Sequence, residues 1–102
     1  MTFDGGPMTE SMYYVLLALF RPNHGYQLMQ AITEVSNGRI QMGPGTLYGI
    51  LTRMQKEGLI EMKNDDGRRK TYEITKYGEL ALRAEYRRLQ AMIEDGKMLT
   101  DR

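Results

Sequence analysis

Apolar residues recur every three or four positions in four stretches of this chain, which is the spacing of amphipathic helices. These stretches predict helices from Thr9 or Ser11 to about Phe20, from Asn23 or His24 to Val35, from Pro44 to about Glu57, and from Lys76 to about Leu99. The ends carry matching signals. Pro22 cannot continue a helix, Gly38 suits a left-handed C-cap, and Thr75 is placed to cap the last helix.

Between the third and fourth helices the apolar residues alternate instead, which is the period of a strand with one buried face. The alternation predicts strands at Leu59–Lys63 and Lys70–Ile74, joined by a turn at Asn64–Gly67. Upstream, residues 39–42 are expected to form a short connector with room for a strand of two or three residues.

The third predicted helix has one apolar stripe, and its remaining faces are small or polar. The stripe is Leu47, Ile50, Leu51 and Met54, and the other faces hold Gly45, Thr46, Tyr48, Gly49, Thr52, Arg53 and Lys56. A helix that enters the major groove needs small or polar residues opposite its apolar side, so that it approaches the bases closely. Amides at the helix start would bind phosphate. The alternative is an ordinary surface helix with a solvated polar face.

The hairpin that follows is basic at its turn. Arg68, Arg69 and Lys70 stand beside Asp66-Gly67, where their charges project from a loop tip. Such a tip is suited to a minor groove or to phosphates. The alternative is a soluble turn with protective charges, and the neighbouring aspartates would pair with the arginines until DNA competes.

The last predicted helix has apolar residues at heptad spacing, which is typical of a helix that packs on another helix. After three helices and a hairpin have closed a domain, such a helix is expected to pair with a second protomer. The expected dimer or effector seam comprises Met12, Tyr13, Leu82, Tyr86, Leu89 and Ile93. The alternatives are that the helix folds back on its own domain, and that the tyrosines and methionines only fill the core.

Together these elements predict a mainly α fold with a small β-hairpin, a winged helix-turn-helix plus a long C-terminal dimerisation helix. Residues 1–8 are expected to be a flexible N-terminal arm, residues 9–75 the winged helix-turn-helix domain, and residues 76–102 the dimerisation helix and tail. The length of 102 residues fits one domain with a single modest core.

Composition and charge narrow the function further. The net charge is +1, yet residues 44–76 carry seven Lys and Arg against five Asp and Glu, so the positive excess lies on the predicted helix and hairpin. No apolar run approaches the roughly 20 residues of a membrane helix. A signal peptide is not evident, and a cytoplasmic location is expected. No catalytic, cofactor or metal motif stands out around the lone His24, so neither an enzyme, a cofactor nor a metal site is expected.

Five segments of the chain carry a resemblance to a known family: Tyr13–Leu19 (YYVLLAL), His24–Tyr26 (HGY), Gly45–Tyr48 (GTLY), Arg53–Ile60 (RMQKEGLI) and Arg69–Gly78 (RKTYEITKYG). On these segments the chain resembles the PadR family of bacterial transcriptional regulators over about residues 9–95. It is similar to the short subgroup, which has a single C-terminal helix.

The resemblance implies a homodimeric winged helix-turn-helix repressor that binds inverted repeats at promoters and is released by a small aromatic or drug-like effector. It implies that Thr46, Tyr48, Gly49 and Thr52 lie on the recognition helix, with Arg68, Arg69 and Lys70 on the wing. Many relatives have proline where this chain has Gly49. Some drug-binding relatives stack ligands on a tryptophan of the last helix, and that role would fall to Tyr86 here.

The sequence therefore predicts a DNA-binding transcriptional regulator whose partners are double-stranded DNA and a second copy of itself, with a small aromatic effector and no membrane. The alternative is a winged-helix module that binds protein. The basic hairpin tip distinguishes the two, since a protein-binding module has no need of three adjacent cations there.

Overall fold

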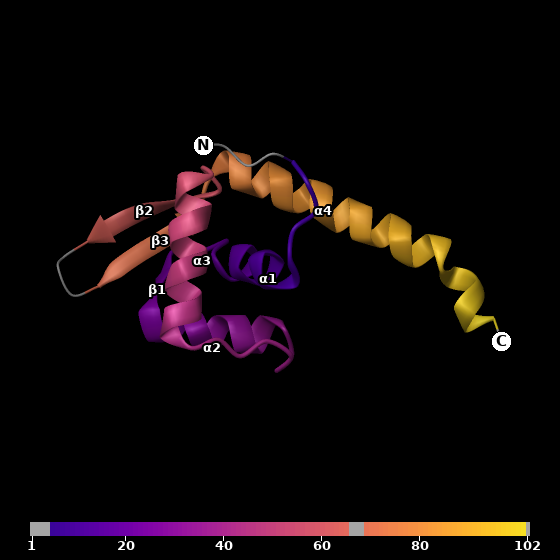
Figure 1. Cartoon of the computed structure of the whole chain (residues 1–102), viewed down its shortest axis with the longest axis horizontal. Coiled ribbons are helices and arrows are strands. Elements are labelled where there is room, and N and C mark those ends of the chain that lie inside the picture. Colours follow the sequence, from indigo (N-terminus) through magenta and orange to yellow (C-terminus); the bar gives the residue numbers. More distant parts are fainter. Residues whose placement is uncertain (1–4, 66–68, 102) are drawn as a thin grey trace.

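The computed structural model describes residues 5–65 and 69–101, and these residues form four α-helices, three short strands and a terminal 3₁₀ turn. In chain order they are α1 (Glu10–Ala18), β1 (Asn23–His24), α2 (Gly25–Val35), α3 (Pro44–Lys56), β2 (Ile60–Asp65), β3 (Lys70–Ile74), α4 (Lys76–Asp95) and η1 (Lys97–Thr100). Figure 1 shows α1, α2 and α3 grouped together, with the β2–β3 hairpin projecting on one side and α4 extending on the other. The predicted winged-helix class is confirmed.

One hydrophobic core holds the three helices and the base of the hairpin together. Its fully buried side chains include Val15, Leu16, Leu19, Leu28, Ile32, Leu47, Leu51, Met54 and Leu59. They come from α1 and its C-cap residue Leu19, from α2 and α3, and from the segment that enters β2. The predicted apolar stripe of α3 is confirmed, with Ile50 at its half-buried edge.

Two threonines begin helices as the sequence predicts. The side-chain oxygen of Thr9 accepts a hydrogen bond from the Met12 amide at 3.1 Å, and that of Thr75 accepts one from the Gly78 amide at 2.9 Å. A Cβ at Gly78 would lie 2.0 Å from the carbonyl oxygen of Leu59, so only glycine fits there. This close approach fixes the start of α4 against the start of β2.

The sheet is antiparallel, with the strand order β1-β3-β2. Ile60 pairs with Ile74 and Met62 pairs with Tyr72, so the predicted alternation places these residues on one face, toward the core. The register shifts between Met62 and Asn64, which marks a bulge at Lys63. The hairpin therefore has a regular base and a distorted outer half.

The structure corrects the prediction for residues 23–24. Asn23 and His24 form β1, a strand that the sequence did not predict and that pairs with Tyr72 and Thr71 of β3. The second helix begins beside them as predicted, at Gly25 with His24 as its N-cap residue. His24 precedes α2 but its side chain makes no capping hydrogen bond, whereas the side-chain oxygen of Asn23 accepts from the His24 amide at 2.8 Å.

Several predicted boundaries also shift. The first helix ends at Ala18, which leaves Phe20 outside it and 45% exposed. The last helix ends at Asp95 and is followed by η1, and residues 39–42 form a connector without a strand. Strand β2 continues to Asp65, so the predicted turn begins later, and residues 66–68 lie outside the described part of the chain.

The segment before α1 packs on the fold at its last residue. Met8, which the sequence assigned to the arm, is 9% exposed and belongs to the core. Its amide donates a hydrogen bond to Glu85 Oε2 of α4 at 3.3 Å. Of the arm, residues 1–4 lie outside the described residues.

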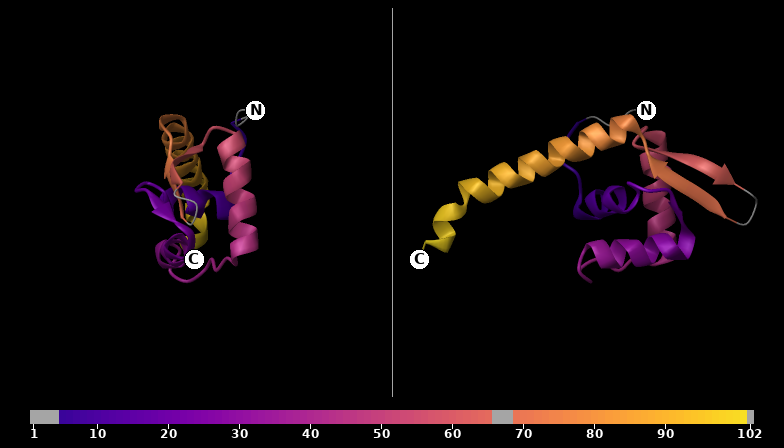
Figure 2. Two further views of the ribbon diagram at one scale, coloured as in Figure 1. Left: turned by 90° about the vertical axis from the view of Figure 1, so that its left-hand side faces the viewer. Right: turned by 180° about the vertical axis from the view of Figure 1, so that it is seen from behind.

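The molecule is elongated, with extents of 55 × 29 × 20 Å. The view from behind in Figure 2 shows why: α4 leaves the other helices and carries the C-terminus far from the hairpin. Within the described residues, none of the helices has the length and apolar character needed to cross a membrane.

Candidate nucleic-acid interface

The exposed face of α3 is the surface on which the predicted recognition residues meet. Gly45, Thr46, Tyr48, Gly49, Thr52, Arg53 and Lys56 are all exposed. Because Leu47, Leu51 and Met54 are completely buried on the opposite side, the helix is held by its apolar stripe and presents its small and polar residues outward.

The glycines of this face are not explained by packing. Apart from the chain neighbours and the backbone of α3 itself, no atom of the described residues lies within 4 Å of the Cβ that an alanine would place at Gly45 or Gly49. Neither residue has a positive φ. Glycine inside a helix costs about 0.5–1 kcal/mol relative to alanine. Gly49, in the middle of α3, is therefore a destabilising residue at a position where the fold leaves room for a side chain.

The hydroxyl groups of Tyr48 and Thr52 are less available for contact with a partner than the sequence suggests. The Thr52 hydroxyl donates to the Tyr48 carbonyl oxygen at 2.8 Å, which leaves its oxygen to accept and its methyl group exposed. The Tyr48 hydroxyl lies 3.6 Å from the position of a Cβ at Gly25, and so leans toward the start of α2. The ring edge of Tyr48 is thus available for contact, while its hydroxyl is directed to the junction of β1 and α2.

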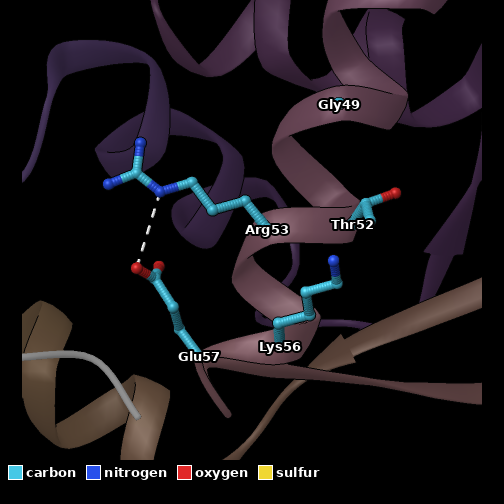
Figure 3. Close-up of a pocket in the computed structure, with 5 residues that line it drawn as sticks. All are labelled: Gly49, Thr52, Arg53, Lys56 and Glu57. Atoms are coloured by element: carbon cyan, nitrogen blue, oxygen red, sulfur yellow. Dashed lines mark hydrogen bonds and ion pairs between the residues drawn. The ribbon is translucent and has the colours of Figure 1, made fainter. Parts of the chain in front are cut away.

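Charged residues lie toward the end of α3. Arg53 Nε lies 3.5 Å from Glu57 Oε2 in an i,i+4 ion pair, and both side chains border a shallow hollow with Gly49, Thr52 and Lys56. Figure 3 shows Arg53 and Glu57 on one side of this hollow and Thr52 on the other. Lys56 makes no ion pair within the described residues.

The wing carries part of the predicted cluster. Arg69 and Lys70 are exposed at the outer end of the hairpin, whereas Arg68 lies outside the described residues. On the face of the hairpin that points away from the core, Glu61 and Glu73 stand opposite each other, and Lys63 Nζ lies 3.6 Å from a carboxylate oxygen of each. The wing is therefore acidic on this outer face and basic toward its tip.

The predicted seam residues divide into core and surface. Met12 and Leu82 are 4% and 3% exposed and belong to the core of the same chain, so they are not available on the surface. Tyr86 and Ile93 are 53% and 75% exposed on α4, with Leu89 half-buried between them. The heptad series thus begins in the core and continues along α4 onto an exposed surface at Ile93.

Between α1 and α4 lies a hollow of about 260 Å³ that the seam prediction only partly identified. Tyr13, Leu82 and Tyr86 belong to the predicted seam, and Leu17, Phe20, Arg83 and Arg87 complete the walls. The Arg83 guanidinium lies 5.8 Å from the centre of the Phe20 ring. Leu17 and Arg83 lie about one helical turn from the predicted Tyr13 and Tyr86 on the same helices, so helical spacing carried a signal for these two. Phe20 lies outside α1 and had no such signal.

Two titratable groups beside this region are perturbed. Burial raises the pKa of the Tyr13 phenol, and the nearby Tyr86, Tyr14 and Glu85 raise it further. Hydrogen bonds from Arg88 and from the Met8 amide hold the pKa of the buried Glu85 carboxyl below its usual range. In the described part of the chain, no group of three or more His, Asp or Glu residues lies close enough to hold a metal ion.

Comparison with known proteins agrees with this architecture. Residues 15–84 match the model of the transcriptional regulator PadR-like family. The transcriptional regulator YqjI of Escherichia coli (strain K12) is 33% identical over 73 residues, which cover 72% of this chain and 35% of that protein. The chain spans between 18% and 64% of the length of the curated relatives that it matches.

Solved structures give the same relationship. A PadR family transcriptional regulator from Eggerthella lenta DSM 2243 superposes with a TM-score of 0.71 at 28% identity, covering 87% of this chain and 77% of that one. A PadR-like transcriptional regulator from Bacillus cereus strain ATCC 14579 gives 0.70 at 25% identity, covering 88% and 90%. These proteins are regulators and not enzymes, as the sequence predicts for this chain. The chain therefore belongs to the PadR-like family of transcriptional regulators.

Proposed function

We propose that this protein is a homodimeric, cytoplasmic repressor that binds an inverted-repeat DNA site and places α3 of each protomer in a major groove. The observation that carries the proposal is the exposed face of α3, where Gly45 and Gly49 have open space around them. Glycines without an intramolecular reason are explained by a partner that approaches the helix backbone closely, and the floor of a DNA groove is such a partner.

Under this proposal, the residues of α3 and the wing have different roles in binding DNA. Lys56, Arg69 and Lys70, together with Arg68, neutralise phosphates and supply most of the affinity. Gly45 and Thr46 bring the helix start to the duplex. Tyr48, Thr52 and Arg53 face the bases and supply discrimination between sequences.

The shape of the chain supports the proposed dimer. Tyr86 and Ile93 lie exposed on a helix that extends beyond the rest of the fold, and exposed apolar residues at heptad spacing are covered when a second copy packs on them. Two recognition helices related by a two-fold axis match a two-fold DNA site.

The proposal also includes a small aromatic effector that binds in the hollow between α1 and α4. The hollow between α1 and α4 combines the rings of Tyr13, Phe20 and Tyr86 with Arg83 and Arg87 at its edge. Aromatic walls with two guanidinium groups favour a flat aromatic anion over a planar cation. Binding there would release DNA only if the compound has a higher affinity for a dimer with altered helix spacing.

The experiment that tests the proposal is selection from a random duplex library by the purified protein. We expect enrichment of an inverted repeat whose half-sites lie about one or two helical turns apart. A folded, dimeric protein that enriches no sequence would contradict sequence-specific binding and would favour the protein-binding module.

A further inference from the structure

Glu57 follows the last residue of α3 and is largely buried for a charged residue. Its side chain is 19% exposed, and Oε1 is buried with no hydrogen-bond partner among the residues that the structure describes. Oε2 faces Arg53 Nε at 3.5 Å (Figure 3). Within the described residues, Arg53 is thus the partner that this carboxylate has.

Stability does not explain a glutamate at this position. A buried carboxylate oxygen without a partner is unfavourable compared with a neutral or apolar side chain. A negative charge at the C-terminal end of a helix also opposes the helix dipole, and the order Arg then Glu is the weaker order for an i,i+4 pair. All three effects disfavour Glu57 in the free protein.

Electrostatic attraction to DNA does not explain a glutamate at position 57 either. The carboxylate borders the hollow that also holds Gly49, Thr52 and Lys56, on the face proposed to meet DNA. A negative charge there repels phosphate and lowers affinity for every duplex. An uncharged residue would serve a purely electrostatic interface better.

The effect of Glu57 on Arg53 offers an explanation. Arg53 has an exposed side chain, 65% accessible, and such a side chain loses considerable rotamer entropy when it is fixed on a base. Contact at Nε occupies one edge of the guanidinium and leaves both terminal amino groups free. Those two groups form the fork that binds guanine O6 and N7 together.

We propose that Glu57 is a positioning residue for sequence recognition: it holds Arg53 by Nε and directs its terminal amino groups toward a guanine edge. The inference rests on the proposed DNA-binding function and deepens it, because it assigns a guanine to each half-site. Glu57 itself touches no DNA in this arrangement, and acts through Arg53.

The test compares binding to the duplex recovered by selection with binding to a scrambled duplex. The proteins are the wild type, Glu57→Met, Arg53→Lys and the double variant. Methionine matches the length of glutamate, suits a buried site, and removes both the charge and the acceptor. Glu57→Gln, which keeps an acceptor oxygen, is the conservative variant, and thermal unfolding confirms that each protein is folded.

We expect Glu57→Met to lower the ratio of specific to scrambled affinity about tenfold, although it makes the protein more positive. Glu57→Gln should restore part of this loss. In the Arg53→Lys background, which lacks the guanidinium fork, adding Glu57→Met should leave the ratio nearly unchanged.

Two results would overturn the inference while leaving the proposed function intact. Equal gains in affinity for both duplexes would show that Glu57 only repels DNA. Equal losses of the ratio in both backgrounds would show that Glu57 acts independently of Arg53. A wild-type protein that does not distinguish the two duplexes would instead refute the proposed function, and the inference with it.

Discussion

Gly49 is a residue at which the stability of α3 and its proposed use for binding DNA oppose each other. It lies in the middle of the helix and is exposed, and apart from its chain neighbours and the backbone of α3 itself, no atom of the described residues lies within 4 Å of an added Cβ. Most exposed helical positions are free to favour a strong helix former. A glycine at such a position is best understood from what meets the helix from outside.

The change Gly49→Ala therefore has two expected effects of opposite sign. It should stabilise the free protein by about 0.5–1 kcal/mol, because alanine loses less backbone entropy in a helix. It should also weaken binding to the selected duplex, because the methyl group occupies the space of close approach. Urea denaturation and fluorescence anisotropy measure the two quantities. Gln90→Ala, at an exposed position of α4, is the control that should leave DNA affinity unchanged. Undiminished affinity of Gly49→Ala would remove the reason given for the glycine.

Glu85 is a buried charged residue of α4 that links this helix to the segment before α1. It is 6% exposed, accepts from Arg88 Nε at 2.9 Å through Oε1, and accepts from the Met8 amide through Oε2. Its pKa is lowered in the folded protein, chiefly by the hydrogen bond from Arg88. The carboxylate therefore stabilises the fold only while it is ionised.

The sign of the pH dependence follows from this direction. The contribution of Glu85 is fully present above the unfolded-state pKa of about 4.5 and is lost as pH falls through the lower folded-state pKa. Glu85→Gln should lower the free energy of unfolding at pH 7. The difference from the wild type should shrink as the pH falls below the unfolded-state pKa of about 4.5. Urea denaturation across pH measures this. Glu79 forms a more exposed ion pair with Arg83 on the same helix. Glu79→Gln is therefore the control, and it should lower the free energy of unfolding at pH 7 much less. A Glu85→Gln deficit independent of pH would contradict an ionic role.

At the scale of elements, the wing is expected to contribute to DNA binding mainly through its charges. Arg69 and Lys70 are exposed at its outer end, while the acidic pair Glu61 and Glu73 lies on the outer face with Lys63. Because the carboxylates would be repelled by phosphate, the wing is expected to approach DNA with its tip and not with this face.

Arg69→Ala should accordingly weaken binding to specific and scrambled duplexes alike. The slope of log affinity against log salt should become shallower by about one unit, since one fewer counterion is released. Titrations at several salt concentrations measure the slope. Lys97→Ala removes the same charge from η1, at the end of the molecule remote from the wing (Figure 1), and should leave the slope unchanged. Equal slopes for Arg69→Ala and the wild type would exclude Arg69 from the interface.

The elements also show what local sequence predicts and what it does not. The start of α3 at Pro44 and the pairing of Ile60 with Ile74 were predictable, because a proline at N1 and a period of two are local signals. Strand β1 was not, since its two residues are a strand only through Thr71 and Tyr72, almost fifty positions later. The burial of Met8 likewise depends on distant Glu85.

In the candidate interface, too, local spacing predicts some features, and others depend on packing between distant residues. Helical spacing was enough to place Thr52 and Lys56 on the exposed side of α3, where the structure has them. The i,i+4 spacing of Arg53 and Glu57 was visible too, but the burial of Glu57 depends on packing at the end of the helix. The position of Phe20 beside Arg83 depends on how α1 meets α4, which no local pattern encodes.

At the scale of the whole molecule, the exposed apolar residues of the extended α4 are expected to pack against a second copy of the chain. Ile93 is 75% exposed and continues the heptad series of Tyr86 and Leu89. Ile93→Glu should convert the expected dimer to a monomer with unchanged helix content, because a charge in an apolar helix seam is strongly unfavourable. Sedimentation equilibrium measures the mass. Leu80→Glu, on another face of the same helix where Leu80 is 57% exposed, should remain dimeric. A wild-type protein that is monomeric at micromolar concentration would contradict the assembly.

The central claim is that α3 and the wing form a sequence-specific DNA-binding surface. Its most direct test is the affinity of the wild-type protein for the selected inverted repeat and for a scrambled duplex, measured at the same physiological salt concentration. We predict a preference of roughly a thousandfold or more for the repeat, the range expected for specific regulators. Equal affinity for the two duplexes, or binding to neither, would contradict the claim.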